Sequence, residues 1–184
     1  IEIDGDKIIA LFATHLTKLN KTNSKFPVIT TVMSNLGFEK YLLNKLKIKL
    51  KRSSVGDINV IKEMGKFNSI LGGEQSGHII LSNFSKTGDG ILAALKVIEI
   101  ISKNNKTASK SFNLYESFPQ NKVNISYKKV LTKNLKFIEN LNKEKLKDKN
   151  MRILIRKSGT EPLIRLLVEG RDINKVQEYS KYYE

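Results

Sequence analysis

A short polar loop near the C-terminus contains the residue types that phosphate binding requires. Its residues are Arg156, Lys157, Ser158, Gly159 and Thr160. The glycine lets the backbone turn where a Cβ would clash, and the N–H groups and hydroxyls of such a turn can converge on an anion. The arginine adds a planar guanidinium that matches two phosphate oxygens at once, which a lysine cannot do. The loop is therefore a candidate phosphate site.

Arginine is rare in the rest of the chain, which has 28 lysines and five arginines. Four of the five lie in or just after this segment, namely Arg152, Arg156, Arg165 and Arg171. Arg165 follows the loop and is a candidate contact for the same anion, because its guanidinium has the same forked geometry. A solvated hairpin with exposed basic side chains explains these residues equally well, so both interpretations stay open.

A second polar loop connects short apolar runs at 69–71 and 79–81, which predict two strands. Its polar residues are Glu74, Gln75, Ser76 and His78, interspersed with three glycines. Polar groups packed this densely usually face a polar ligand. The loop is therefore a second candidate binding site.

The composition is typical of a globular protein, with 40% apolar and 28% charged residues in a chain of 184. The absence of cysteine excludes disulfides and thiolate metal sites, and it fits a cytoplasmic location. Apolar runs such as 91–101 are interrupted by Lys96 and Glu99, so no membrane span is expected. The chain begins at Ile1 with neither an initiator Met nor a signal peptide, and we expect it to be a piece of a longer protein.

The net charge of +15 raises the question of nucleic-acid binding, since lysines neutralise phosphates and release counterions. The lysines are spread along the chain, however, and few aromatic residues are interleaved with them as stacking platforms. We interpret them as a solvated face and expect no nucleic-acid partner.

Helical and strand patterns alternate through the first part of the chain. Helices are predicted at about 7–19, 37–46, 58–64 and 91–101, and strands at 27–32, 48–50, 69–71 and 79–81. Asp6, Asp57 and Asp89 are the predicted helix N-caps. The order indicates an α/β sheet with crossover helices. We reject a metal site at Asp4-Gly5-Asp6, because Asp6 serves as a cap and no third ligand follows in register.

A polar, aperiodic stretch at 103–109 predicts a domain boundary shortly afterwards. The remaining residues predict a strand at 123–127, a helix at about 132–145, two strands flanking the phosphate loop, and a helix at 173–183. This order is typical of a small α+β domain with an antiparallel sheet. The sequence thus predicts two domains, 1–110 and 111–184.

The strings Leu71–His78 and Arg156–Pro162 resemble the sugar-binding and phosphate-binding loops of the α-D-phosphohexomutases, most closely those of bacterial phosphoglucosamine mutases. Further similar strings lie in order at 55–57, 87–90 and 118–124. The resemblance covers essentially the whole chain. It implies a three-layer α/β domain with a mixed sheet over 1–110, followed by a small, TBP-like α+β domain with an antiparallel sheet over 111–184. These would be the third and fourth domains of such an enzyme.

The resemblance also implies roles for individual residues. Glu74 and Ser76 would contact sugar hydroxyls, because a carboxylate accepts from vicinal hydroxyls and a serine can donate or accept. Gly56 and Asp57 would lie in a substrate-binding turn, although Ile58-Asn59 follow where the family commonly has Arg-Tyr. His78 would transfer a proton or stabilise charge, since imidazole titrates near neutral pH, or would only hydrogen-bond the loop backbone.

The implied activity is the interconversion of glucosamine 6-phosphate and glucosamine 1-phosphate through a phosphoserine and a bisphosphate intermediate. The family's phosphoserine and its Asp-Gly-Asp-x-Asp-Arg magnesium loop would precede Ile1. Mg²⁺ is therefore expected as a cofactor of the full-length enzyme, with its ligands absent from this chain, and the N-terminal domains of the same polypeptide are the expected partners. A phosphomannomutase or phosphoglucomutase is an alternative, and a non-catalytic anion or nucleic-acid binding module is another.

Overall fold

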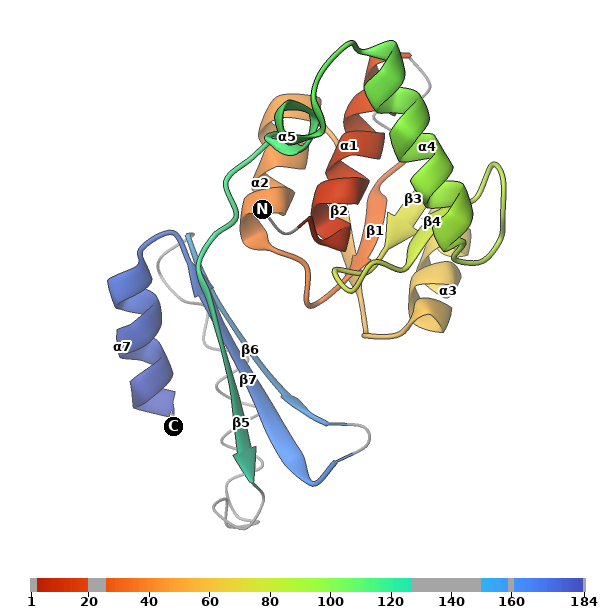
Figure 1. Cartoon of the computed structure of the whole chain (residues 1–184). Helices are drawn as coiled ribbons and strands as arrows, with labels where there is room; N and C mark the ends of the chain where they lie inside the picture. The colour runs from red at the N-terminus through yellow and green to blue at the C-terminus, as the bar shows by residue number, and fades with distance from the viewer. Residues whose placement is uncertain (1–2, 20–25, 127–149, 159–160, 184) are drawn as a thin grey trace. The chain divides into compact units, whose positions relative to one another are not determined.

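A computed structural model of the chain describes residues 3–19, 26–126, 150–158 and 161–183. The chain divides into two compact units, Ile1–Ser117 and Phe118–Glu184 (Figure 1). In the described ranges, no helix is both long enough and apolar enough to cross a membrane.

The first unit alternates helices and strands, as the periodicity predicts. Its elements are α1 (Gly5–Lys18), β1 (Val28–Thr31), α2 (Leu36–Tyr41) with a π-helical turn η1 (Leu42–Leu46), β2 (Leu50–Ser53), α3 (Asp57–Phe67), β3 (Leu71–Gly73), β4 (Ile79–Leu81), α4 (Gly90–Lys103) and α5 (Ala108–Phe112). The described strands form one sheet in the order β2-β1-β3-β4. Strand β1 is parallel to β2 and β3, whereas β4 is antiparallel to β3. The predicted mixed sheet is confirmed.

Apolar side chains cover both faces of this sheet, which makes the unit a three-layer structure. Val28 packs with α1, α2 and α4, while its neighbour Ile29 packs with Val60 and Met64 of α3. Successive residues of a strand point to opposite faces, so the two cores lie on opposite sides of the sheet. Figure 1 shows α1 and α4 on one side and α3 on the other.

Two of the three predicted helix caps are wrong. Helix α1 begins at Gly5 and is capped by Asp4, which accepts a 3.0 Å hydrogen bond from the Lys7 N–H, whereas Asp6 is buried inside the first turn. Helix α3 begins at Asp57, so its cap is Gly56, which has a φ of 113°. The chain turns at Gly56 because only glycine adopts this conformation readily. Asp89 caps α4 as predicted, accepting from the Leu92 N–H at 2.9 Å.

The helix predicted at 37–46 is divided between α2 and the η1 turn. Lys47 ends the turn in the left-handed region with a φ of 59°. Leu42 is buried in the core, whereas Leu43 is 51% exposed. The following strand begins at Leu50, and Ile48 fills the core instead of pairing in a half-exposed strand.

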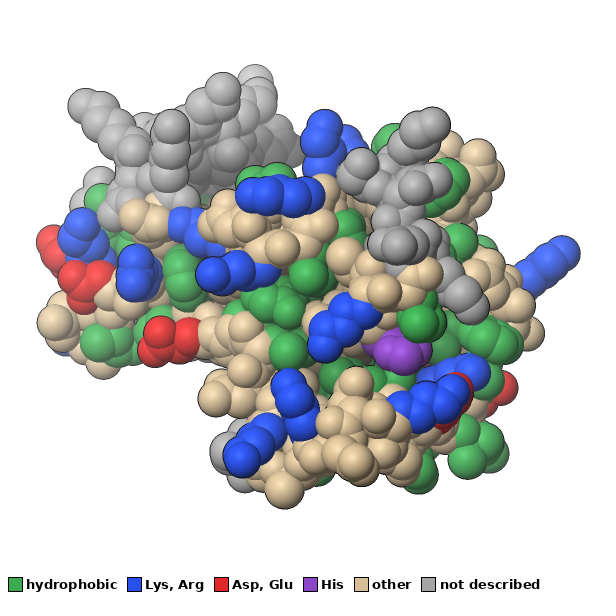
Figure 2. All heavy atoms as spheres, turned by 90° about the horizontal axis from the view of Figure 1, so that it is seen from above, with side chains coloured by type: hydrophobic (Ala, Val, Ile, Leu, Met, Phe, Trp, Pro, Cys, Tyr) green, Lys and Arg blue, Asp and Glu red, His purple; other side chains and the backbone are tan. Residues whose placement is uncertain are grey.

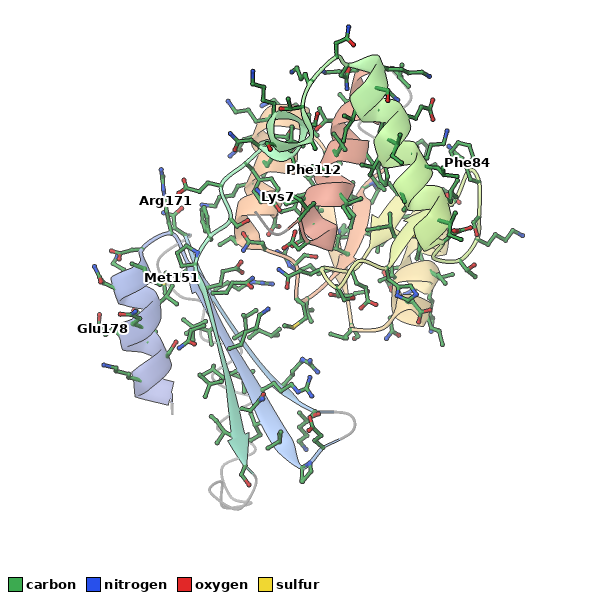
Figure 3. The ribbon with its side chains drawn as sticks, viewed as in Figure 1. Lys7, Phe84, Phe112, Met151, Arg171 and Glu178 are labelled. Carbon is green, nitrogen blue, oxygen red and sulfur yellow. The ribbon has the colours of Figure 1, made fainter. Side chains whose placement is uncertain are left out.

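The first unit ends with an anchored segment rather than a free linker. Phe112 of α5 is buried in the main core, and Tyr115 stacks on Phe38 and Tyr41. Lys7 of α1 donates to the Tyr115 carbonyl and lies over its ring; Lys7 and Phe112 are labelled in Figure 3. These contacts explain why the first unit extends to Ser117, beyond the boundary predicted near residue 110.

The second unit contains an antiparallel sheet in the order β5-β7-β6, with a helix packed against it. Its described elements are β5 (Gln120–Ser126), β6 (Met151–Lys157), β7 (Leu163–Gly170) and α7 (Ile173–Tyr183). Alternate residues of β7, Ile164, Leu166 and Val168, face Val176 of α7 in the core. This arrangement confirms the predicted antiparallel fold, while the helix predicted at 132–145 lies outside the described residues.

Candidate functional site

Glu74 is held through both its backbone and its carboxylate. Its N–H donates to the His78 carbonyl at 2.8 Å, and its own carbonyl accepts from the Gly77 N–H at 3.0 Å. Its Oε1 accepts a 3.0 Å hydrogen bond from the Gly56 N–H. No described residue donates a hydrogen bond to Oε2. The half-buried carboxylate is thus fixed in place with one oxygen available to a ligand.

The hydrogen bond between Gly56 and Glu74 joins two of the predicted site segments. Strands β2 and β3 both run parallel to β1, so the loops that follow them leave the same edge of the sheet. Ligands of α/β sheets usually bind outside the carboxyl ends of the strands. The predicted residues Gly56, Asp57 and Glu74 therefore lie at the edge where a ligand is expected.

Ser76 and His78 are exposed on the same loop as Glu74. The imidazole of His78 lies against Gly88, where an added Cβ would be 2.6 Å from its Cδ2 atom. The loop before α4 therefore makes room for the histidine ring by having a glycine there. His78 thus remains accessible, as proton transfer or charge stabilisation would require.

The second unit places two arginines side by side. Arg156 of β6 is the direct cross-strand partner of Arg165 of β7, and directly opposite residues share a face of the sheet. Burial lowers the pKa of Arg156, and the charge of Arg165 lowers it further. Like charges opposite one another destabilise a strand pair, and a bound anion would remove this cost.

Polar atoms beside these arginines have no protein partner in the described ranges. Ser158 Oγ and Arg165 Nε are both buried without a hydrogen bond. A terminal nitrogen of Arg165 forms an ion pair with Glu161 at 2.6 Å. Lys157 is exposed at the end of β6, and the predicted contacts Gly159 and Thr160 lie outside the described residues. Buried donors without partners are costly, so this loop is suited to an added acceptor such as phosphate.

A buried carboxylate in the same sheet was missed by the sequence analysis. Glu169 of β7 is fully buried and is paired with Arg152 of β6 at 2.7 Å. The Gln120 side chain of β5 donates to its other oxygen at 2.8 Å. A glutamate ending an apolar strand, with an arginine on the neighbouring strand, is the signal that could have predicted this pair.

The described residues do not fit a magnesium site. No three of their His, Asp or Glu side chains are grouped so that they could hold a metal ion. Oδ1 of Asp4 and Oδ2 of Asp6 accept hydrogen bonds from the backbone N–H groups of Lys7 and Asn35, so these two oxygens serve the fold. We therefore assign no step to a metal held by this part of the chain.

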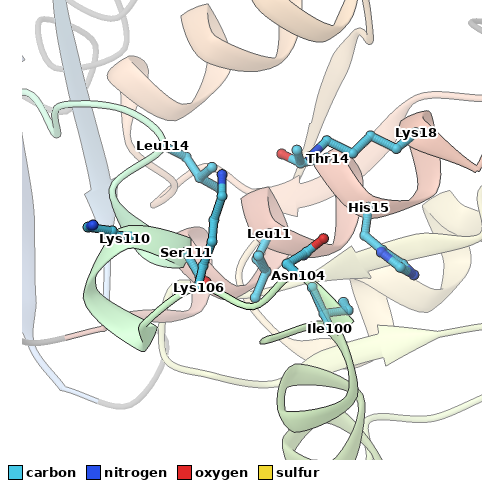
Figure 4. A pocket seen from close by; sticks show the side chains of 10 residues that line it. All are labelled: Leu11, Thr14, His15, Lys18, Ile100, Asn104, Lys106, Lys110, Ser111 and Leu114. Carbon is cyan, nitrogen blue, oxygen red and sulfur yellow. The ribbon is translucent and has the colours of Figure 1, made fainter. Parts of the chain in front are cut away.

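The first unit has cavities of about 380 and 520 Å³, and neither is lined by residues of the two candidate loops. The cavity in Figure 4, lined by His15, Lys18 and Lys106 among others, has a volume of about 40 Å³. This is close to the space that one water molecule occupies, too little for a sugar phosphate. Lysine and arginine side chains are scattered over the face shown in Figure 2 and do not form one continuous patch there.

Both units match known families of domains. Residues 4–118 match "Phosphoglucomutase/phosphomannomutase, alpha/beta/alpha domain III", and residues 121–182 match the "Phosphoglucomutase/phosphomannomutase, C-terminal domain". A phosphoglucosamine mutase of Fusobacterium nucleatum is 44% identical over 97% of this chain and 40% of its own length. That of Campylobacter fetus is 45% identical over 98% of this chain and 41% of its own length.

Solved structures share the fold. A crystal structure of N-acetylglucosamine-phosphate mutase in a product complex has a TM-score of 0.75 at 24% identity, covering 97% of this chain and 43% of its own. A phosphoglucomutase/phosphomannomutase family protein from Burkholderia thailandensis has a TM-score of 0.78 at 16% identity. The match covers 97% of this chain and 40% of that protein's chain. The chain spans about 40% of the length of the curated relatives it matches. With both units matched in order, the chain belongs to the phosphoglucomutase/phosphomannomutase family.

Proposed function

We propose that this chain is the C-terminal part of a phosphoglucosamine mutase and that its two loops bind an amino-sugar phosphate. The names of its relatives support an amino-sugar phosphate as the ligand, since the phosphoglucosamine mutases of Fusobacterium nucleatum and Campylobacter fetus are 44% and 45% identical to this chain. The solved N-acetylglucosamine-phosphate mutases, including one with GlcNAc-6P and magnesium, act on related sugars.

The single observation that carries the proposal is the unbalanced positive charge and the unpaired buried donors at the loop after β6. Arg156 and Arg165 are like-charged neighbours, and buried donors at Ser158 and Arg165 have no partner in the described ranges. A phosphate dianion would neutralise the arginines and accept from both donors. Lys157, Gly159 and Thr160 are proposed to complete this site. Because the loop recognises phosphate without contacting the sugar, it can hold the phosphate of either the 1- or the 6-phosphate.

The sugar is proposed to bind the loop between β3 and β4. The oxygen of Glu74 that is not bonded to Gly56 can accept hydrogen bonds from neighbouring sugar hydroxyls. Ser76 is exposed beside it and Asp57 follows Gly56 in the adjacent turn. His78 is proposed to assist proton transfer or to stabilise charge at the reacting hydroxyl.

In the full-length enzyme, a phosphoserine in the preceding part would donate its phosphoryl group and later recover one from the bisphosphate. Such transfer depends on positioning and on charge stabilisation. The part of this chain would be to orient the sugar and to hold the phosphate that does not react. We propose that this activity is cytoplasmic, needs Mg²⁺ bound outside this chain, and is absent from the 184 residues alone.

The test is an NMR titration of the chain with inorganic phosphate and with the 6-phosphates of glucosamine, glucose and mannose. We expect weak binding of every ligand at residues 156–158 and 165, and added shifts at 74–78 that are largest for glucosamine 6-phosphate. Shifts confined to surface lysines outside residues 156–158 and 165 would contradict the phosphate site. Equal or larger shifts with mannose or glucose phosphate would assign a different sugar. Mutase turnover by the chain alone would contradict its proposed inactivity.

A further inference from the structure

We infer that Gly5, the first residue of α1, is a positioning residue for Glu74, an inference that rests on the proposed role of Glu74 as a sugar ligand. Gly5 is buried beneath the loop between β3 and β4. Its N–H donates a 2.9 Å hydrogen bond to the carbonyl of Gln75. The start of α1 is thus attached directly to the segment that carries Glu74.

This contact requires a residue without a side chain at position 5. A Cβ added to Gly5 would overlap the Glu74 carbonyl oxygen and would lie 2.9 Å from the Gly77 nitrogen. Both atoms belong to the backbone, so no side-chain rotation can relieve the overlap. The loop is also held by its own backbone hydrogen bonds, from the Glu74 N–H to the His78 carbonyl at 2.8 Å and from the Gly77 N–H to the Glu74 carbonyl at 3.0 Å. A larger residue at position 5 must therefore displace the loop.

The aspartates beside Gly5 fix the start of the helix from two sides. Asp4 caps α1 through Oδ1, while its Oδ2 accepts a 3.4 Å hydrogen bond from the Gln75 side chain. Asp6 turns inward and accepts from the Asn35 N–H at 2.7 Å, which joins α1 to the loop after β1. The Asp4-Gly5-Asp6 string therefore connects the N-terminus of α1 to two loops at the same edge of the sheet.

Glu74 is consequently held at two points. Gly5 supports the backbone of its loop from one side, and the Gly56 N–H fixes its carboxylate from the other. Displacing the backbone by the width of a methyl group would break the geometry of the carboxylate contact. Ordered ligand contacts depend on supporting residues of this kind, and small displacements lower affinity strongly.

The test compares Gly5→Ala with Gly90→Ala. Gly90 is the first residue of α4, a helix of the same 14-residue length that also follows an aspartate cap, but a Cβ there would meet nothing within 4 Å. The measurements, both by NMR on the whole chain, are hydrogen exchange of the Glu74 and Gly77 amides and titration with glucosamine 6-phosphate. We expect Gly5→Ala to speed exchange and to weaken binding at 74–78 by at least about tenfold each. Gly90→Ala should match wild type in both.

Amide signals of α4 (Gly90–Lys103), which belongs to the same unit as Gly5, serve as an internal check that this unit still folds. If Gly5→Ala does not fold, Asp4→Asn replaces it, because asparagine caps a helix as well as aspartate does but has only one acceptor oxygen. It should speed exchange in the same loop while keeping α1 intact.

The outcomes separate this inference from the proposed function. Wild-type exchange and sugar affinity in Gly5→Ala, or in Asp4→Asn where that variant replaces it, would overturn the inference and leave the sugar site standing. No response of residues 74–78 to glucosamine 6-phosphate in the wild type would overturn the sugar site. The exchange rates alone would then decide whether Gly5 holds the loop.

Discussion

The backbone N–H of Asn35 donates a 2.7 Å hydrogen bond to Oδ2 of Asp6, whose side chain is completely buried. Burial raises the pKa of Asp6 from 3.8 to about 6, although the hydrogen bond from Asn35 and the charge of Arg52 act in the opposite direction. The carboxylate is thus costly to ionise in the folded protein.

The raised pKa predicts a pH dependence of stability. Between about pH 4 and pH 6 the folded chain binds a proton at Asp6 that the unfolded chain has lost, so the free energy of unfolding falls as pH rises. The loss amounts to about 3 kcal/mol and is complete above the folded pKa. Asp6→Asn keeps an acceptor for Asn35 and should remove this component in urea unfolding at pH 4, 6 and 8. Glu178→Gln, which changes an exposed residue, is the control. If the free energy of unfolding of Asp6→Asn depends on pH as that of the wild type does, the prediction is contradicted.

Replacing Glu74 should damage catalysis in the proposed full-length mutase. Glu74→Ala removes the carboxylate proposed to accept from sugar hydroxyls and frees the Gly56 N–H. Hydrogen bonds to charged groups contribute about 1.5–3 kcal/mol each, so we expect kcat/KM to fall roughly a hundredfold. The measurement is steady-state kinetics beside Glu178→Ala, which alters an exposed carboxylate of α7 (Figure 3). Near-normal kinetics would count against Glu74 as a sugar ligand.

Replacing His78 should show whether its side chain has a chemical role or only a structural one. General acid–base catalysis contributes about a hundredfold to ten-thousandfold, so His78→Ala should lower kcat of the longer enzyme by at least the smaller factor. The measurement is steady-state kinetics of the wild-type and variant enzymes with glucosamine 6-phosphate. If more than about a tenth of kcat remains, His78 only supports the loop, because that loss is below the range for proton transfer.

Arg156→Lys should weaken phosphate binding while keeping the charge. A lysine cannot offer the paired donors of a guanidinium, and we expect about a tenfold higher Kd for inorganic phosphate, or roughly 1.4 kcal/mol. Arg171→Lys, a change at an exposed arginine after β7, is the matched control. Equal affinities in the wild type and both variants would show that phosphate binds elsewhere.

The elements that follow from local pattern were the ones predicted well. Helix α4 was predictable because its cap, Asp89, and the first residue of its apolar run, Ile91, are close together in the sequence. Asp6 is not the cap that the sequence predicts, because its side chain turns inward to accept a hydrogen bond from Asn35, which is distant in the sequence. The contact between Gly56 and Glu74 could not be read from spacing either, since it forms only once β2 and β3 both align with β1.

Glu169 of β7 links β7 to both other described strands of the second sheet through side-chain contacts. Its cross-strand neighbours on β6 and β5 are Arg152 and Gln120, and both are bonded to its carboxylate. Sliding either edge strand by one residue would turn that partner to the opposite face and leave a buried charge underpaired. Misaligned versions of the sheet are therefore penalised during folding. The same alignment sets Arg156 opposite Arg165, so a carboxylate outside the proposed phosphate site protects the pairing of the two arginines against errors in strand assembly.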